Sequence, residues 1–128
     1  MITGYSYVVN NLRARAKRFA VNVFDVIDQI PSSPKGLVIQ TQLAKAASSA
    51  AANYRTAQRA RSRAEFISKL SIALEGFDES GFWLEFLPDT RLVPLQSVEP
   101  LISEAGELSV IVVASRGTAR RNDPKKKP

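Results

Sequence analysis

The chain has 128 residues, of which 45% are apolar, and this is the size and composition of a single domain that can bury its own core. It contains neither cysteine nor histidine. Disulfides, thiolate catalysis, imidazole bases and the usual zinc sites are therefore excluded. The net charge of +6 is compatible with an anionic partner, and its distribution along the chain is more informative.

No segment is suited to crossing or entering a membrane. The longest strongly apolar run, at residues 110–114, is far shorter than the ~20 residues that span a bilayer. The first residues lack the apolar core of a secretory signal, and four basic side chains follow between Arg13 and Arg18. We therefore expect a cytoplasmic protein with no membrane partner.

The first predicted helix covers residues 11–30, where apolar side chains recur at spacings of three and four. Asn10 or Asn11 is the expected N-cap. The Pro-Ser-Ser-Pro sequence that follows should end this helix and begin the next, with Ser33 as N-cap and Pro34 in the first turn. The expected inner face consists of Leu12, Ala16, Phe19, Val23, Val26, Ile27 and Ile30.

The second predicted helix covers residues 34–60. Alanine and serine fill its centre, so that neighbouring helices can approach closely. A low-complexity segment is the alternative interpretation, but alanine is the best helix former and the flanking residues are periodic. The expected inner face consists of Ile39, Leu43, Ala46, Ala47, Ala50 and Tyr54.

The third predicted helix covers residues 62–87. Ser62 and Glu65 fit a capping box, in which each side chain accepts a hydrogen bond from the other end of the first turn. Gly76 and Gly81 each weaken the helix by about 1 kcal/mol relative to alanine, and Pro88 should stop it. The expected inner face consists of Phe66, Leu70, Ala73, Phe77 and Leu84, with Ile67, Leu74 and Leu87 beside it.

The fourth predicted helix covers residues 97–119, with Ser97 as N-cap and Pro100 in the first turn, where amides have no intrahelical partner. Residues 122–128 are expected to form a disordered basic tail. The expected inner face consists of Val98, Leu101, Ile102, Ala105, Leu108, Val112 and Val113.

Short connections force consecutive helices to be antiparallel neighbours. No segment alternates with period two for long enough to predict a strand. The predicted fold is therefore all-α: one antiparallel up-down-up-down four-helix bundle that spans residues 1–121.

Charge is distributed unevenly along this bundle. Residues 1–70 carry eleven basic and three acidic side chains, whereas residues 71–115 carry one basic and eight acidic side chains. Folding back and forth collects basic residues at one end, and we predict that this end binds RNA or DNA through phosphate contacts. We call the following set the basic pole: Arg55, Arg59, Arg61 and Arg63 at its centre, with Arg13, Lys17, Arg120 and Arg121 alongside.

Other charged residues are expected to follow the same division. Arg15, Arg18 and Arg116 should accompany the basic pole. The opposite end should collect Asp25, Asp28, Glu85, Asp89, Glu99 and Glu104, with Lys35 and Arg91 as basic exceptions.

The basic residues could also form an ordinary solvated face with local ion pairs. Two like-charged pairs, Arg13 with Lys17 and Arg59 with Arg63, favour a binding surface if each pair lies within one helix, because their repulsion is relieved by an anion. No helix-turn-helix, zinc finger or aromatic RNA-binding sheet is present, so sequence-specific recognition is not predicted.

The sequence lacks the motifs of enzymes and metal proteins. Di-metal sites in helical bundles need Glu-x-x-His pairs, so Glu75, Asp78 and Glu79 are interpreted as a solvated acidic face. No phosphate-binding glycine loop or nucleophile elbow occurs. We expect no enzymatic activity, no catalytic residue, no metal and no cofactor.

Three aromatic residues, Phe82, Trp83 and Phe86, lie close together in the third predicted helix. They cannot all point into one narrow core, so at least one should be exposed or should contact another subunit. For each residue taken singly, core packing is the favoured expectation.

The chain resembles the bacterial four-helix bundle proteins related to the protein encoded in the intervening sequence of 23S ribosomal RNA. The central run Ala-Arg-Ser-Arg-Ala-Glu-Phe-Ile-Ser-Lys-Leu, at residues 60–70, is the most specific part of the resemblance. Gly76 and Gly81, each followed by phenylalanine, depart from the family pattern and put the straightness of the third helix in doubt. The other matching segments are residues 42–43, 48–49, 52–55, 78–80, 83–85, 113–115 and 118–121.

This resemblance implies a homo-oligomer, a ring-shaped homopentamer of antiparallel four-helix bundles. Relatives that serve as accessory proteins of diversity-generating retroelements are basic and bind nucleic acid and a reverse transcriptase. Nucleic-acid binding is thus indicated by the charge distribution and by the resemblance, whereas the pentamer is indicated by the resemblance alone. The alternative is a structural or adaptor protein that binds another protein, such as a reverse transcriptase or a ribosome-associated partner, and has no nucleic-acid role of its own.

Overall fold

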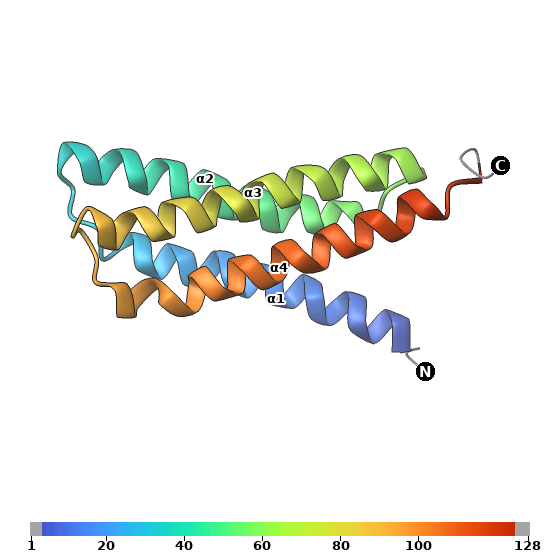
Figure 1. Cartoon of the computed structure of the whole chain (residues 1–128), viewed down its shortest axis with the longest axis horizontal. Coiled ribbons are helices and arrows are strands. Elements are labelled where there is room, and N and C mark those ends of the chain that lie inside the picture. Colours follow the sequence, from blue (N-terminus) through green and yellow to red (C-terminus); the bar gives the residue numbers. More distant parts are fainter. Residues whose placement is uncertain (1–3, 125–128) are drawn as a thin grey trace.

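The structure is a computed structural model that describes the backbone of residues 4–124 and the side chains of residues 11–124. This part of the chain forms four helices and no strand: α1 (Gly4–Ile27), α2 (Pro34–Ala57), α3 (Arg63–Asp89) and α4 (Leu95–Arg121). Figure 1 shows them as a rod in which consecutive helices run in opposite directions. The prediction of an all-α four-helix bundle is confirmed. No helix in the described residues is both long and apolar enough to span a membrane.

The helices do not contact one another equally. The most extensive interfaces join α2 to α3 and α3 to α4, and the smallest joins α1 to α4. In Figure 1 the first turns of α1 point away from the last turns of α4. The bundle is therefore closed more weakly along its α1–α4 side than along the others.

Two of the predicted helix caps are present. The Ser33 hydroxyl accepts a hydrogen bond from the Gly36 amide at 3.1 Å, and Pro34 opens α2. The Ser62 hydroxyl accepts one from the Glu65 amide at 3.0 Å. The Glu65 carboxylate accepts a hydrogen bond from the Arg61 amide at 3.3 Å. A capping box predicts a bond from the next amide, that of the N-cap residue Ser62.

The predicted starts of two helices are wrong. Helix α1 already begins at Gly4, so Asn10 and Asn11 lie inside it and are not caps. The helix can extend this far because no helix-breaking residue lies between Gly4 and Asn10. Helix α4 begins at Leu95, after an extended Pro94, so Ser97 lies in its first turn rather than before it. Pro100 consequently lies beyond that turn, where its missing amide removes an intrahelical hydrogen bond.

The ends of α1 and α3 also differ from expectation. Helix α1 ends at Ile27, and Ile30 lies in the following turn, although it is buried as predicted. Pro88 does not stop α3. The chain leaves this helix through Arg91, whose φ of 63° is left-handed, while the Leu92 amide bonds the Leu87 carbonyl at 3.1 Å. This is a Schellman motif with arginine at the position that usually holds glycine.

The end of the chain is described only in part. Helix α4 extends to Arg121, and the Asn122 amide bonds the Thr118 carbonyl at 3.1 Å. Residues 125–128, which make up most of the predicted basic tail, lie outside the described residues.

The core contains most of the side chains that the helical periodicity placed there. Phe19 of α1 and Phe77 of α3 meet edge to face at its centre, with ring centroids 5.7 Å apart. Leu12, Ile27, Phe66, Ile67, Leu74 and Ile102 are only partly buried. Val113 was placed wrongly, because 46% of its surface is exposed on the outer side of α4.

The aromatic residues of α3 also differ from the expectation for each residue taken singly. Phe82 and Phe86 are 52% and 39% exposed, and Trp83 packs partly against the core. The three rings contact one another on the surface, with centroids 4.9 to 5.7 Å apart. The narrow bundle has room for only one side of α3, as the crowding argument predicted.

Helices α2 and α3 approach closely at the alanine-rich centre of α2. Gly76 of α3 faces Ala46 and Ala50, and a Cβ atom on Gly76 would lie 2.7 Å from the Ala50 Cβ and 2.8 Å from the Ala46 carbonyl oxygen. These distances are too short for real contacts, so glycine is required here by packing. This requirement accounts for one of the two glycines that weaken α3.

We predict that Gly76→Ala destabilises the protein. The substitution improves helix propensity by about 1 kcal/mol, but it forces apart the tightest interface, at a cost of about 1–3 kcal/mol. Urea unfolding should therefore give a lower free energy of unfolding than for the wild type. Ser68→Ala, at an exposed position of the same helix, serves as the control and should leave stability unchanged or raise it slightly. An increase in stability for Gly76→Ala would show that the α2–α3 contact is looser than described.

Candidate nucleic-acid interface

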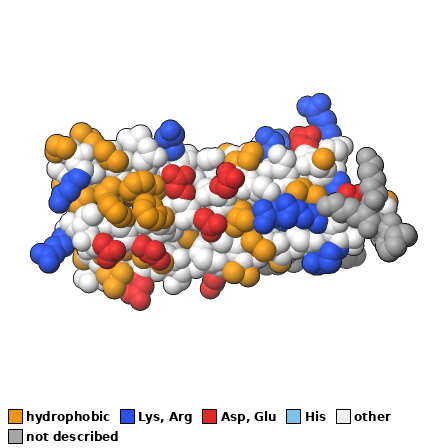
Figure 2. Space-filling model, turned by 45° about the horizontal axis from the view of Figure 1, so that its top comes forward, with side chains coloured by type: hydrophobic (Ala, Val, Ile, Leu, Met, Phe, Trp, Pro, Cys, Tyr) orange, Lys and Arg blue, Asp and Glu red, His pale blue; other side chains and the backbone are white. Residues whose placement is uncertain are grey.

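The helix ends that carry the basic pole lie together in the fold. Figure 1 shows the start of α1, the end of α2, the start of α3 and the end of α4 at one end of the rod. On the face drawn in Figure 2, Lys and Arg side chains gather toward this end, while Asp and Glu lie mainly over the middle and the other half. Basic side chains also occur at the other end in Figure 2, where Lys35 and Arg91 were expected as exceptions.

A groove between α1 and α2 brings three members of the basic pole together. Arg13 and Lys17 lie one turn apart on α1, Arg55 comes from α2, and Ala14, Ala51 and Ala52 complete the lining. The groove encloses about 500 Å³. Within the described part of the chain, none of the three cationic side chains forms an ion pair or a hydrogen bond. The α1–α2 groove is therefore open, with an apolar floor and cationic side chains along its edges.

The turn between α2 and α3 carries two further arginines of the basic pole. Arg59 and Arg61 are both exposed, and in the described residues their only hydrogen bonds are donated by their backbone amides, to the Thr56 carbonyl and the Glu65 carboxylate. Because Arg59 lies after α2 and Arg63 begins α3, the two are not neighbours within one helix. The repulsion argument therefore applies to Arg13 and Lys17 but not to this pair.

The remaining members of the basic pole differ in how far they are engaged. The Arg63 guanidinium donates a hydrogen bond to the Ala119 carbonyl at 2.9 Å, which ties the start of α3 to the end of α4. Arg121 bonds the Thr118 hydroxyl at 3.2 Å. Arg120 is exposed. Arg63 thus has a structural contact as well as a place in the interface.

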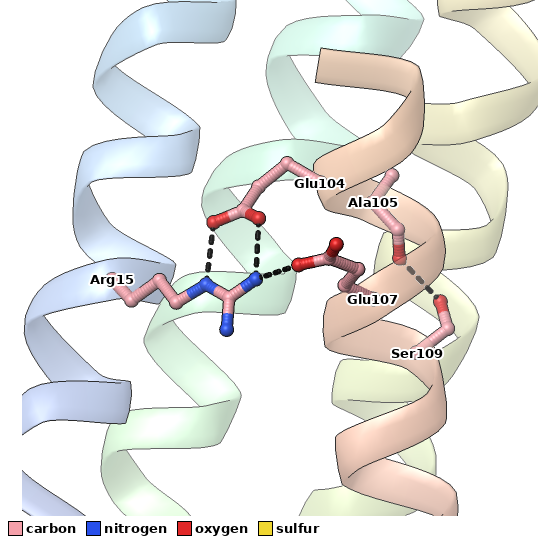
Figure 3. Close-up of polar contacts among 5 residues, drawn as sticks. All are labelled: Arg15, Glu104, Ala105, Glu107 and Ser109. Atoms are coloured by element: carbon pink, nitrogen blue, oxygen red, sulfur yellow. Dashed lines mark hydrogen bonds and ion pairs between the residues drawn. The ribbon is translucent and has the colours of Figure 1, made fainter. Parts of the chain in front are cut away.

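Arg15 does not belong to the interface. Its guanidinium donates two hydrogen bonds to the Glu104 carboxylate, at 2.7 and 2.6 Å, and a further one to Glu107 (Figure 3). These contacts join α1 to α4 along their weakly packed side. Hydrogen bonds to Glu104, supported by the charges of both carboxylates, raise the pKa of Arg15 above its ordinary value.

The predicted division of charge is wrong for Arg15 and Glu104. They were expected at opposite ends of the bundle, yet they meet along its length, because residue 15 lies near the middle of α1 and residue 104 well inside α4. Arg116 also has a partner outside the interface, because its guanidinium donates a hydrogen bond to the Ser71 hydroxyl at 3.2 Å. Glu107, a partner of Arg15, was not identified from the sequence.

Among the acidic residues of α3, Asp78 and Glu79 accept hydrogen bonds from other side chains. Among the described residues, no group of three or more Asp or Glu side chains is arranged to hold a metal ion. Asp78 instead accepts a hydrogen bond from the Ser109 hydroxyl at 3.1 Å, and Glu79 one from the Trp83 indole at 3.4 Å.

Residues 10–114 match the sequence profile of the 23S rRNA-intervening sequence protein family. The chain belongs to this family. A crystal structure of a protein with unknown function from the S23 ribosomal protein family of Bacteroides thetaiotaomicron has a similar fold, with a TM-score of 0.76. The two sequences are 28% identical, over 82% of this chain and 97% of that one. Comparison with curated proteins finds no match.

The intervening-sequence family match covers most but not all of the interface. It includes the α1–α2 groove and the turn between α2 and α3, together with Arg15 and both of its partners. Arg120 and Arg121 lie beyond it, so the resemblance of residues 118–121 to the end of the family's last helix receives no support from this match.

We predict that Arg15→Gln destabilises the bundle without changing the interface. Loss of a partly buried, bidentate ion pair should lower the free energy of unfolding by about 1 kcal/mol, and less at high salt because the ions are screened. Urea unfolding at two salt concentrations measures this. Arg18→Gln removes the same charge from an exposed position on the same helix. Equal effects of the two substitutions would contradict a structural role for Arg15.

Proposed function

We propose that this protein is a non-enzymatic, oligomeric protein that binds RNA or DNA through phosphate contacts at its basic pole. The observation that carries the proposal is the α1–α2 groove. There Arg13, Lys17 and Arg55 converge from two helices, and no carboxylate of the described residues neutralises them. Such a concentration of cations is the electrostatic footprint of a protein that binds a polyanion.

The carboxylates at the far end of the rod are too distant to cancel this charge. A helix of 27 residues such as α3 is about 40 Å long, whereas charges in solution are screened over about 8 Å at physiological salt. Arg15, which lies between Arg13 and Lys17 on α1, is the only cation of the described residues that forms an ion pair with carboxylates of α4. A polyanion approaching the α1–α2 groove therefore meets three cations that form no ion pair within the described residues.

The side chains of the interface suit the nucleic-acid backbone rather than the bases. Arginine binds phosphate oxygens in a bidentate manner, and lysine acts as a point charge. Between its cationic side chains the groove is lined by alanine, and none of the described residues that line it has an aromatic ring on which a base could stack. Affinity should therefore depend strongly on salt and only weakly on sequence.

Assembly would strengthen this binding. The family resemblance implies a homopentameric ring, and a ring presents the basic pole once per subunit. Several weak phosphate sites on one particle raise the overall affinity without any new contact. Light scattering of the purified protein would establish the number of subunits.

A salt titration with fluorescently labelled RNA and duplex DNA tests the proposal. For the wild type, the logarithm of the affinity should fall linearly with the logarithm of the salt concentration, with a slope of about −0.9 for each phosphate contacted on duplex DNA. The double substitution Lys17→Gln with Arg55→Gln should weaken binding to all sequences and reduce the slope by about 2.

The matched control removes two positive charges elsewhere. Lys35→Gln with Lys45→Gln acts on exposed residues of α2 outside the α1–α2 groove and should leave the slope almost unchanged. Binding that does not respond to salt, an absence of binding, or equal effects of the two double variants would contradict the proposal. A protein partner that is lost in Arg59→Glu with Arg61→Glu, in the absence of nucleic-acid binding, would instead support the adaptor function.

A further inference from the structure

Two glycines of the bundle have no explanation within a single chain. Glycine in the interior of a helix lowers its stability, and at Gly76 close packing explains its presence. At Gly81 of α3, however, an added Cβ atom would meet only the Ala105 Cβ, at an ordinary 3.7 Å. At Gly106 of α4 it would meet nothing within 4 Å. Alanine would fit at both positions.

Both glycines line the same groove. It lies between α3 and α4, encloses about 240 Å³, and is bordered by Phe82, Asp78 and Glu85. Apolar atoms of Ile102 and Ala105 contribute to its wall. Side chains at the two glycine positions would narrow it, so the glycines keep open a space that the isolated bundle does not need.

One edge of the groove is continuous with the exposed aromatic cluster. Phe82 borders the groove, is 52% exposed, and contacts Trp83 and Phe86 through ring centroids 4.9 and 5.7 Å away. Phenylalanine rings exposed to this extent next to an open groove are typical of a surface that another molecule covers.

The charge of this region specifies the kind of molecule. Asp78 and Glu85 flank the groove, and Glu79 is exposed on the side of α3 that faces α2. Within the described residues these carboxylates pair with no Lys or Arg side chain; the contacts of Asp78 and Glu79 are with a hydroxyl and an indole. The surface thus combines unneutralised negative charge with exposed aromatic faces, which is complementary to a cationic side chain with an apolar stem.

We propose that the α3–α4 groove is a docking site for an arginine-bearing helical segment of a protein partner. An arginine stem lies in the groove against Phe82 and Ile102, and its guanidinium reaches one of the two flanking carboxylates, Asp78 or Glu85, which are about 10 Å apart along α3. Guanidinium stacks on aromatic rings and forms bidentate pairs with carboxylates, so arginine fits better than lysine. Gly81 and Gly106 let the partner's backbone come close to the bundle. This site is independent of the basic pole and of nucleic-acid binding.

Trp83, the single tryptophan of the chain, contacts the Phe82 ring at the edge of the groove and therefore reports on this site. The probe is a synthetic amphipathic peptide with leucine on one helical face and arginine on the other, and its twin carries glutamate in place of arginine. Titration of the full-length protein with the arginine peptide should change the Trp83 emission in a saturable manner. The glutamate twin should have no effect.

Two sets of variants distinguish docking in the groove from general electrostatic attraction between the acidic surface and the basic peptide. Asp78→Asn with Glu85→Gln should weaken peptide binding about tenfold. Asp89→Asn with Glu99→Gln removes two exposed charges outside the groove and should have little effect. Equal weakening by both pairs would overturn the proposal. So would an emission change that depends on the concentration of the protein alone, because a second copy would then cover the surface.

The glycines provide the sharpest test, because stability and binding should change in opposite directions. Gly81→Ala with Gly106→Ala should raise the temperature of unfolding through better helix propensity, and it should weaken peptide binding by narrowing the groove. If affinity is unchanged, no partner occupies the groove. If the unfolding temperature falls, the glycines have a role within the bundle, and the proposal loses its basis.

Discussion

Three tight connectors, at residues 28–33, 58–62 and 90–94, reverse the chain after each of the first three helices and fix which helix ends lie together. Each is secured locally. Ser33 and Ser62 cap the helices that follow the first two, and a Schellman motif with a left-handed Arg91 ends α3 before the third. Because these reversals are short, basic residues that are distant in sequence have to share one end of the rod. The proposed interface depends on this geometry rather than on any single side chain.

The molecule separates two kinds of surface along its length. The end formed by the start of α1 and the end of α2 presents cations around an alanine-lined groove, whereas the α3–α4 side presents carboxylates and exposed aromatic rings. Arg15 forms ion pairs with Glu104 and Glu107. These pairs hold α1 to α4, the two neighbouring helices that share the smallest interface of the bundle. Among the described residues, the ion pairs of Arg15 lie where the bundle needs a structural contact. The two proposed binding surfaces are separate, so a protein partner and a polyanion would not compete for the same residues.

The sequence predicted the fold, most of the core and the general position of the basic pole, because helical periodicity and serine caps are local signals. The sequence was a poor guide to features that depend on the relative alignment of two helices. The meeting of Arg15 with Glu104 and the alanine floor of the α1–α2 groove follow from the alignment of α1 with its neighbours, which no local pattern encodes. The cap at Pro94 was missed because it makes no side-chain capping hydrogen bond.

The most direct measurement is a map of backbone amide chemical shifts during titration of the full-length protein with a short RNA duplex. Contacts between phosphates and the basic pole predict that the largest changes occur around residues 13–17 and 51–63, that they diminish as salt is added, and that residues 78–86 are unaffected. Changes concentrated on the α3–α4 side, or changes spread evenly over the rod, would contradict the assignment of the polyanion to this end of the bundle.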